Sequence, residues 1–139
     1  MHLGACHCGN LRYEFETALA PEELPLRACQ CTFCRAHGAL STSDPKGSVR
    51  IQVQDAGLLQ RYRFGLGITD FLICRRCGVY LLAMMEIEGH HYAVLSANVL
   101  DCRERMGPVQ PMDYDGEDQV GRIARRKTRW TPVTSLSGC

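Results

Sequence analysis

The sequence predicts a mostly β fold that is stapled through clustered cysteines, and two observations support this prediction. Short segments alternate apolar and polar side chains with the two-residue period of a half-buried strand. The second observation is that seven of the nine cysteines fall into three closely spaced groups. The length of 139 residues fits one domain with a substantial core. We therefore expect a single domain over residues 1–139.

The expected elements, in chain order, are a strand at residues 11–15, one helical turn at 20–24, a short segment at 26–28 that leads into a cysteine group, and strands at 48–53, 58–64, 71–74, 79–87 and 92–99. Pro21 stands near the start of the helical turn, where its missing N–H is tolerated. Val49, Ile51 and Val53 share one face of their strand. The last two strands form a hairpin around residues 88–90.

The composition of the chain limits which classes of function and which cellular compartment we expect. The net charge of +1 gives no general attraction to nucleic acid or to an anionic membrane. No apolar run approaches the length of a membrane span, and the first residues lack the pattern of an export signal. We therefore expect a cytoplasmic protein with free thiols. The alternative is a disulfide framework, but closely spaced C-x-C and C-x-x-C pairs suit a tetrahedral ion better.

The segment after Asp101 differs in character from the rest. An acidic patch is followed by a basic one: Asp113, Asp115, Glu117 and Asp118, then Arg122, Arg125, Arg126, Lys127 and Arg129. We interpret the basic patch as a solvated amphipathic turn or short helix, although it could also bind nucleic-acid phosphates. Residues 135–139 are expected to fray.

The three cysteine groups are C-x-C-G at residues 6–9, C-x-C-x-x-C at 29–34 and C-x-x-C-G at 74–78. Seven thiolates fill one closed four-ligand zinc site and leave three for an open site, and an open position is typical of catalytic zinc. The glycine after the first and third groups permits a tight turn that aims backbone N–H groups at the sulfurs. The predicted structural zinc site is Cys6, Cys8, Cys74 and Cys77. The predicted open site is Cys29, Cys31 and Cys34.

A rival division combines the two C-x-x-C pairs, as in zinc ribbons. It would use Cys31, Cys34, Cys74 and Cys77, leaving Cys6, Cys8 and Cys29 spare. The histidines are weaker candidates for ligands, and Cys102 and Cys139 match no pair.

Three motifs stand in order along the chain: Gly4-Ala5-Cys6-His7-Cys8-Gly9, Cys29-Gln30-Cys31-Thr32-Phe33-Cys34-Arg35 with Gly38, and Phe71-Leu72-Ile73-Cys74-Arg75-Arg76-Cys77-Gly78. In these motifs the chain resembles the glutathione-dependent formaldehyde-activating enzyme (GFA) family. The resemblance covers about residues 4–101 and leaves residues 102–139 as a C-terminal extension of the same domain. It implies the Mss4-like fold, a β-sandwich of folded antiparallel sheets. It also implies a structural zinc at the first and third motifs and a catalytic zinc at the second.

The resemblance further implies a carbon–sulfur lyase activity with glutathione as cosubstrate. Formaldehyde and glutathione would join as S-hydroxymethylglutathione. Zinc could stabilise the glutathione thiolate or polarise the aldehyde oxygen. Glutathione carries two carboxylates that arginine side chains could bind. Arg35, which follows Cys34 directly, is the first candidate, ahead of Arg61, Arg63 and Arg75.

Two other functions remain open at this point. A non-catalytic zinc module could contact protein or nucleic acid through its basic C-terminal segment, with Arg125, Arg126 and Lys127 as contacts. A methionine sulfoxide reductase would need a reactive cysteine in an Arg-x-Cys-x-Asn setting. Cys102 stands in Leu-Asp-Cys-Arg-Glu, which does not match that setting.

Overall fold

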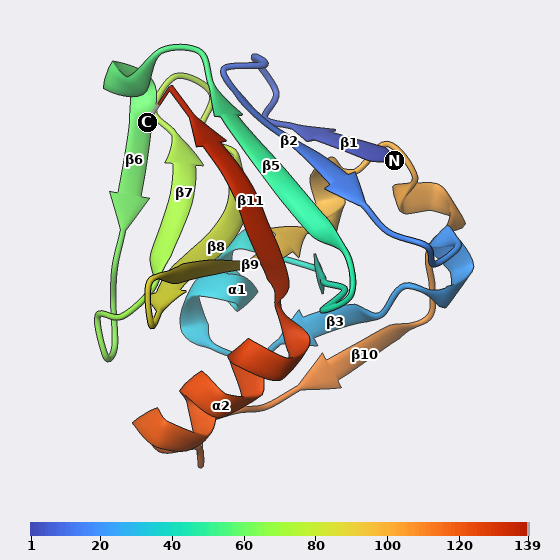
Figure 1. Ribbon diagram of the computed structural model, residues 1–139, viewed down its shortest axis with the longest axis vertical. Helices are drawn as coiled ribbons and strands as arrows, with labels where there is room; N and C mark the ends of the chain where they lie inside the picture. Colours follow the sequence, from blue (N-terminus) through green and yellow to red (C-terminus); the bar gives the residue numbers. More distant parts are fainter. Residues whose placement is uncertain (139) are drawn as a thin grey trace.

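The computed structural model describes residues 1–138, and this part of the chain is mostly β (Figure 1). The strands are β1 His2–Ala5, β2 Leu11–Glu16, β3 Leu26–Cys29, β4 Ser41–Thr42, β5 Ser48–Val53, β6 Leu59–Tyr62, β7 Asp70–Cys74, β8 Tyr80–Ile87, β9 His90–Ser96, β10 Val109–Met112 and β11 Thr131–Ser137. The helices are α1 Thr32–His37 and α2 Gln119–Arg129, and short 3-10 turns lie at Pro21–Glu23, Ala56–Leu58, Ala97–Val99 and Arg103–Arg105. The prediction of a mostly β fold is confirmed.

The strands form two curled layers that share β11 (Figure 1). The first layer has the order β1-β2-β5-β11, and the second contains β3, β4 and β6 to β10. Thr131 and Pro132 pair with β9 of the second layer, and Val133 begins the pairing with β5 of the first. Most pairs are antiparallel, as expected, but β11 runs parallel to β5 and β10 runs parallel to β3.

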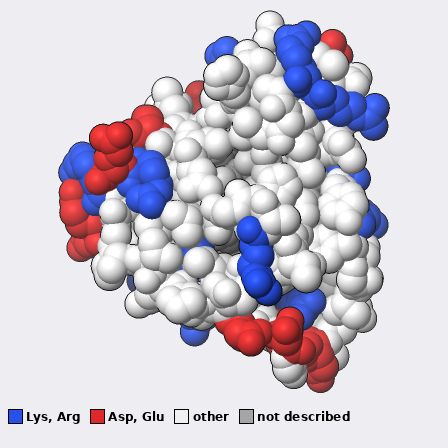
Figure 2. Space-filling model, turned by 180° about the vertical axis from the view of Figure 1, so that it is seen from behind, with Lys and Arg blue, Asp and Glu red and all other residues white. Residues whose placement is uncertain are grey.

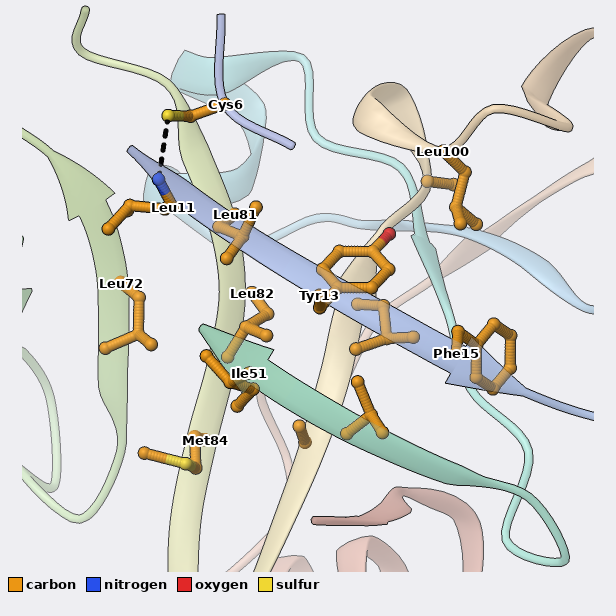
Figure 3. Close-up of a cluster of buried hydrophobic side chains, with 14 of the residues drawn as sticks. Cys6, Leu11, Tyr13, Phe15, Ile51, Leu72, Leu81, Leu82, Met84 and Leu100 are labelled. Atoms are coloured by element: carbon orange, nitrogen blue, oxygen red, sulfur yellow. Dashed lines mark hydrogen bonds between the residues drawn. The ribbon is translucent and has the colours of Figure 1, made fainter. Parts of the chain in front are cut away.

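The main hydrophobic core fills the space between these layers (Figure 3). Leu11, Tyr13 and Phe15 alternate along β2 and point inward because a strand turns successive side chains to opposite faces. Ile51 of β5 and Leu82 of β8 complete the centre of the cluster and are fully buried. Each such side chain contributes roughly 1.5–3 kcal/mol through burial.

A second hydrophobic cluster covers the opposite face of β8. Leu82 and Met84 point into the main core, whereas Ala83, Met85 and Ile87 belong to the second cluster. Cys34 of α1, Phe71 of β7, Tyr80 of β8 and Trp130, which follows α2, also belong to this cluster. Both faces of β8 are therefore buried, which explains its nearly unbroken run of apolar residues.

The C-terminal part of the chain is more ordered than the sequence predicted. The expectation of a frayed end at residues 135–139 is wrong as far as the described residues go, because Ser135, Leu136 and Ser137 pair with β5. Their partners on β5 lie 85 positions earlier in the chain, so no local sequence pattern predicts this pairing. Cys139 lies outside the described residues. No helix in the described part has the length and apolar character needed to cross a bilayer.

Candidate metal centres and the adjoining cavity

The first cysteine cluster joins the N-terminal segment to the turn between β7 and β8. Its four Sγ atoms lie within 4.8 Å of one another and belong to Cys6, Cys8, Cys74 and Cys77. The Sγ atom of Cys8 lies 3.8 Å from that of Cys6 and 3.5 Å from that of Cys74. Sulfurs at ~2.3 Å from a tetrahedral zinc are roughly 3.8 Å apart. The donor set therefore fits a zinc ion with all four positions filled.

Backbone turns hold these sulfurs together. Gly9 and Gly78 have φ values of 84° and 77°. Residues other than glycine rarely adopt this region. The Leu11 N–H donates to Cys6 Sγ over 3.2 Å (Figure 3). Each turn thus folds the chain back so that N–H groups face sulfur, as the glycine positions predicted.

The ionisation of this cluster is set by burial and by backbone hydrogen bonds. Burial raises the pKa of Cys6 to about 11. A backbone hydrogen bond from Asn10 lowers the pKa of Cys8. Burial also opposes ionisation of Cys77, but hydrogen bonds from the backbone of Cys8 and Val79 and from the side chains of Cys74 and Cys6 together lower its pKa to about 6. Thiolates, the form that binds zinc, are therefore available on the exposed side of the cluster.

The second cysteine cluster lies where β3 meets α1. Cys29 ends β3, Cys31 is the N-cap of α1, and Cys34 occupies the first turn of that helix. Their Sγ atoms lie within 4.8 Å of one another, and Cys31 Sγ accepts a hydrogen bond from the Cys34 N–H over 3.4 Å. No other residue of the described chain joins the group. The donor set fits zinc with one position left for another ligand.

The sulfurs of the second cluster share one strong interaction. The hydrogen bond between the Cys34 and Cys29 side chains lowers the pKa of Cys29 to about 6, against the opposing effect of burial. The same hydrogen bond, together with burial, raises the pKa of Cys34. This hydrogen bond therefore favours the thiolate form of Cys29 over that of Cys34.

The other sequence candidates fall outside the two clusters. The two C-x-x-C pairs stand in different clusters, so the ribbon-like division is not formed. His7 and His37 are exposed and belong to neither group. Cys102 is buried beside His2 and Asp101, where the His2 Nδ1 and Asp101 Oδ1 atoms lie 3.6 Å apart.

A cavity of about 140 Å³ opens directly onto the second cysteine cluster. Cys29, Cys31 and Cys34 line one side. Aromatic side chains and the loop between β6 and β7 form other walls, with Phe64, Gly65, Leu66, Gly67, Phe71, Tyr80 and Trp130. Burial raises the pKa of Tyr80 well above its usual value, so its phenol stays protonated. Its hydroxyl makes no hydrogen bond to another described residue.

Residues 1–114 match the sequence profile of the glutathione-dependent formaldehyde-activating enzyme family. The chain belongs to this family. It is also similar to the crystal structure of a Rhodobacter sphaeroides protein, at 26% sequence identity and a TM-score of 0.61. That similarity covers 79% of this chain and 99% of the other. The family match ends before α2, so the helix and β11 lie beyond the matched residues.

The helix α2 forms another wall of the cavity beside the second cysteine cluster, and this wall is strongly basic. Arg122, Arg125, Arg126 and Arg129 recur at spacings of three and four residues, which places them on one face of the helix. All four line the cavity. The interpretation of this run as a solvated face holds for Lys127 and Arg129, which are exposed, but Arg122, Arg125 and Arg126 are only partly exposed. The signal that could have found them is their spacing, which the sequence already contains.

The arginines favoured from the sequence do not reach the cavity. Arg35 is exposed and does not line it. Arg61 and Arg63 bind Asp70 instead, with nitrogen–oxygen distances of 3.3 and 2.6 Å. Arg75 also lies outside the cavity wall. Proximity to a cysteine motif along the chain was therefore a poor guide to the charges around it.

Two of the cavity arginines are held on α2 by a single acid. Glu117 accepts hydrogen bonds from Arg125 Nε at 2.8 Å and from Arg122 Nε at 3.3 Å. The Arg125 guanidinium also stacks on Tyr114, 3.6 Å from the ring centroid. Hydrogen bonding from Arg125 and Arg122 lowers the pKa of Glu117. The acidic patch therefore fixes this end of the helix beside the cavity.

Proposed function

We propose that this protein is a zinc-dependent carbon–sulfur lyase that makes or cleaves a thiol adduct of a small aldehyde. Glutathione and formaldehyde are the expected pair, as the family description suggests. The observation that carries the proposal is the convergence of three cysteine sulfurs on the wall of a cavity. Such a set leaves one side of a bound ion facing the space where a substrate would lie.

In the proposed roles, Cys29, Cys31 and Cys34 hold the catalytic zinc and Cys6, Cys8, Cys74 and Cys77 hold a structural one. A zinc ion bound at the open site supplies Lewis acidity and stabilises a deprotonated thiol. In the forward direction the thiol sulfur forms a bond to the aldehyde carbon, the carbonyl double bond becomes single, and the thiol proton ends on the oxygen.

The remaining cavity residues position the reactants. The Tyr80 hydroxyl, which has no described protein partner, offers a hydrogen bond to the aldehyde oxygen. Phe64, Phe71 and Trp130 exclude water from one side of the cavity. Holding both reactants in one cavity removes part of the entropic barrier to their joining. Because this chemistry needs free thiols, we also propose that the protein works in the cytoplasm.

The alternative function, a non-catalytic module with a basic contact surface, gains little support from the geometry. The arginines of α2 line the cavity, and Glu117 binds two of them. On the face shown in Figure 2, basic side chains lie in separate small groups, several of them beside acidic ones. A nucleic-acid surface would present a continuous basic stripe.

Metal analysis tests the division of ligands. We expect about two zinc ions per chain in the native protein and about one in a Cys29/Cys31/Cys34 triple serine variant. Cys102→Ser is the matched control, because this buried cysteine belongs to neither cluster, and it should retain both ions. Equal zinc in the native and triple-variant proteins would contradict the division.

An activity assay tests the reaction itself. Native protein should accelerate formation of the adduct between glutathione and formaldehyde. Nuclear magnetic resonance measures this rate as the exchange between free and bound formaldehyde. Cys31→Ser should abolish this acceleration and leave the fold intact. Acceleration that survives in Cys31→Ser would place the chemistry elsewhere.

A further inference from the structure

The cavity wall carries more positive charge than its own acids neutralise. Five arginines line it, namely Arg27, Arg122, Arg125, Arg126 and Arg129. The nearby acids are Asp115, which lines the cavity, and Glu117, which lies behind the wall and binds two of these arginines. A zinc ion with three thiolates adds one net negative charge. Two positive charges therefore remain without a partner inside the cavity.

Arg129 also forms no described ion pair, but it is exposed to solvent, so the unpartnered charge away from solvent lies on Arg27 and Arg126. Neither forms an ion pair with any described carboxylate. Arg126 contacts Thr69, Met85 and the Trp130 ring, all uncharged groups, and its buried Nε has no hydrogen-bond partner. A buried charged donor without an acceptor destabilises the folded chain, unless a ligand supplies the acceptor.

The position of Arg27 relates this charge to the cysteine cluster. Arg27 and Cys29 are two residues apart on β3, so both side chains point to the same face of the strand. This spacing separates their Cα atoms by roughly 6.6 Å. The Arg27 Nη1 donates to Ser43 Oγ at 3.0 Å, which leaves its other donors for the cavity. A ligand whose sulfur lies at the cysteines therefore has an anion-binding site a few bonds away.

We propose that Arg27 and Arg126 bind a carboxylate of the thiol ligand, so that the cavity selects anionic thiols over neutral ones. This inference rests on the proposed function, because it assigns the part of the ligand that lies away from the sulfur. The arginines act as binding residues and take no part in the bond that forms. Arg27 on β3 lies within the family match, whereas Arg126 on α2 lies beyond it.

A ligand that cannot coordinate metal separates this inference from the chemistry. S-methylglutathione keeps both carboxylates but has no free thiol. We expect it to bind the native protein and to change the fluorescence of Trp130, which is the chain's only tryptophan and lines the cavity. Arg27→Gln and Arg126→Gln should each weaken binding by about 10-fold to 100-fold, the effect of one charge-assisted hydrogen bond. The diethyl ester of the same ligand should bind weakly to every variant.

Lys127→Gln is the matched control, because Lys127 is the next residue on α2 but binds Glu88 outside the cavity. It should bind S-methylglutathione like the native protein. Calorimetry should replace fluorescence for Arg126→Gln, whose guanidinium stacks on Trp130. If that variant does not fold, Arg27→Gln on β3 carries the test alone.

Equal affinity for the acid and its ester, or unchanged affinity in Arg27→Gln, would overturn the inference. Cys31→Ser separates the two proposals. It should lose turnover of glutathione and formaldehyde while it still binds S-methylglutathione. Native protein that turns over glutathione and formaldehyde but binds the acid and its ester equally would refute only the arginine assignment. Native protein that binds the acid more tightly than the ester but does not turn over glutathione and formaldehyde would refute only the proposed reaction.

Discussion

The two cysteine clusters use the same ligand atom but lie on opposite faces of the second layer. Cys6 and Cys74 belong to the main core between the layers. Cys34 belongs to the second cluster of apolar residues, with Cys29 and Cys31 packed against it. Strand parity explains the difference, since Cys74 shares a face of β7 with Leu72, and Cys29 shares a face of β3 with Arg27.

This difference in setting indicates a difference in role. The first cluster ties segments 66 residues apart, from Cys8 to Cys74, and continues the packing of the core. The second cluster is built from six consecutive residues and borders a cavity. A metal ion bound at the first cluster would therefore restrain the fold, whereas one bound at the second would restrain only a local turn and face the cavity.

The largest expected effect is on stability, from substitution in the first cluster. Cys74→Ser should lower the free energy of unfolding by on the order of 5 kcal/mol, because coupled metal binding makes up much of a small domain's stability. Cys31→Ser should change it by less than about 1 kcal/mol. Urea denaturation of both proteins measures the contrast. Cys102→Ser controls for the burial of a hydroxyl, and equal losses at positions 74 and 31 would break the comparison.

The second expected effect is on metal release. Sharing the binding free energy of a four-thiolate zinc among its ligands assigns ~3 kcal/mol to each, so the three-cysteine site should be weaker by on the order of 100-fold. Titration with a chelator should remove one zinc well before the other. The first release should leave the fold intact, and the second should unfold the protein. Simultaneous release of both ions would show that the clusters do not differ in this way.

The third effect tests the strand that delivers Cys6. Gly4 pairs with Tyr13, and a Cβ on Gly4 would overlap the Tyr13 ring. Gly4→Ala should therefore cost about 1–3 kcal/mol, the usual cost of overpacking a core. Gly116→Ala is the matched control, since a Cβ there meets no atom within 4 Å. Thermal unfolding compares the two, and similar melting temperatures would argue against tight packing at β1.

The cysteine grouping could be predicted from the sequence because ligand number and turn glycines are local features. The strand at residues 48–53 was predicted with its observed bounds, since Val49, Ile51 and Val53 alternate without interruption. The pairing of β10 with β3 could not be predicted. It brings Met112 beside Cys29 across 83 positions, and only tertiary packing selects that partner.

The arginines show where a local argument fails. Arg35 follows Cys34 in sequence, but successive residues of a helix point about 100° apart, so Arg35 faces solvent while Cys34 is buried. The regular spacing of arginines on α2 was visible in the sequence. What the helix faces depends on β10 and β11, which position both of its ends. The candidate sulfurs were therefore predictable and the cavity around them was not.

The smallest expected effect concerns the acid that fixes α2 beside the second cluster. Glu117 has a lowered pKa because it accepts hydrogen bonds from Arg125 and Arg122. Its ion pairs therefore add stability above the ordinary glutamate pKa of ~4.3, and this contribution is lost as the pH falls through the lowered pKa. Glu117→Gln should cost about 1–2 kcal/mol at pH 7, in line with hydrogen bonds to charged groups.

The difference in unfolding free energy between native protein and Glu117→Gln should shrink as the pH falls below about 4. Comparing the two proteins at each pH removes the effect of acid on the thiolates, which both share. Glu88→Gln is the control, because Glu88 binds Lys127 on the exposed side of α2 and should change stability little at any pH. A pH-independent cost of Glu117→Gln would mean that packing, and not charge, fixes α2. The arginine wall beside the open cluster would then not depend on Glu117 ionisation, in contrast to the first cluster, where backbone turns alone aim the sulfurs.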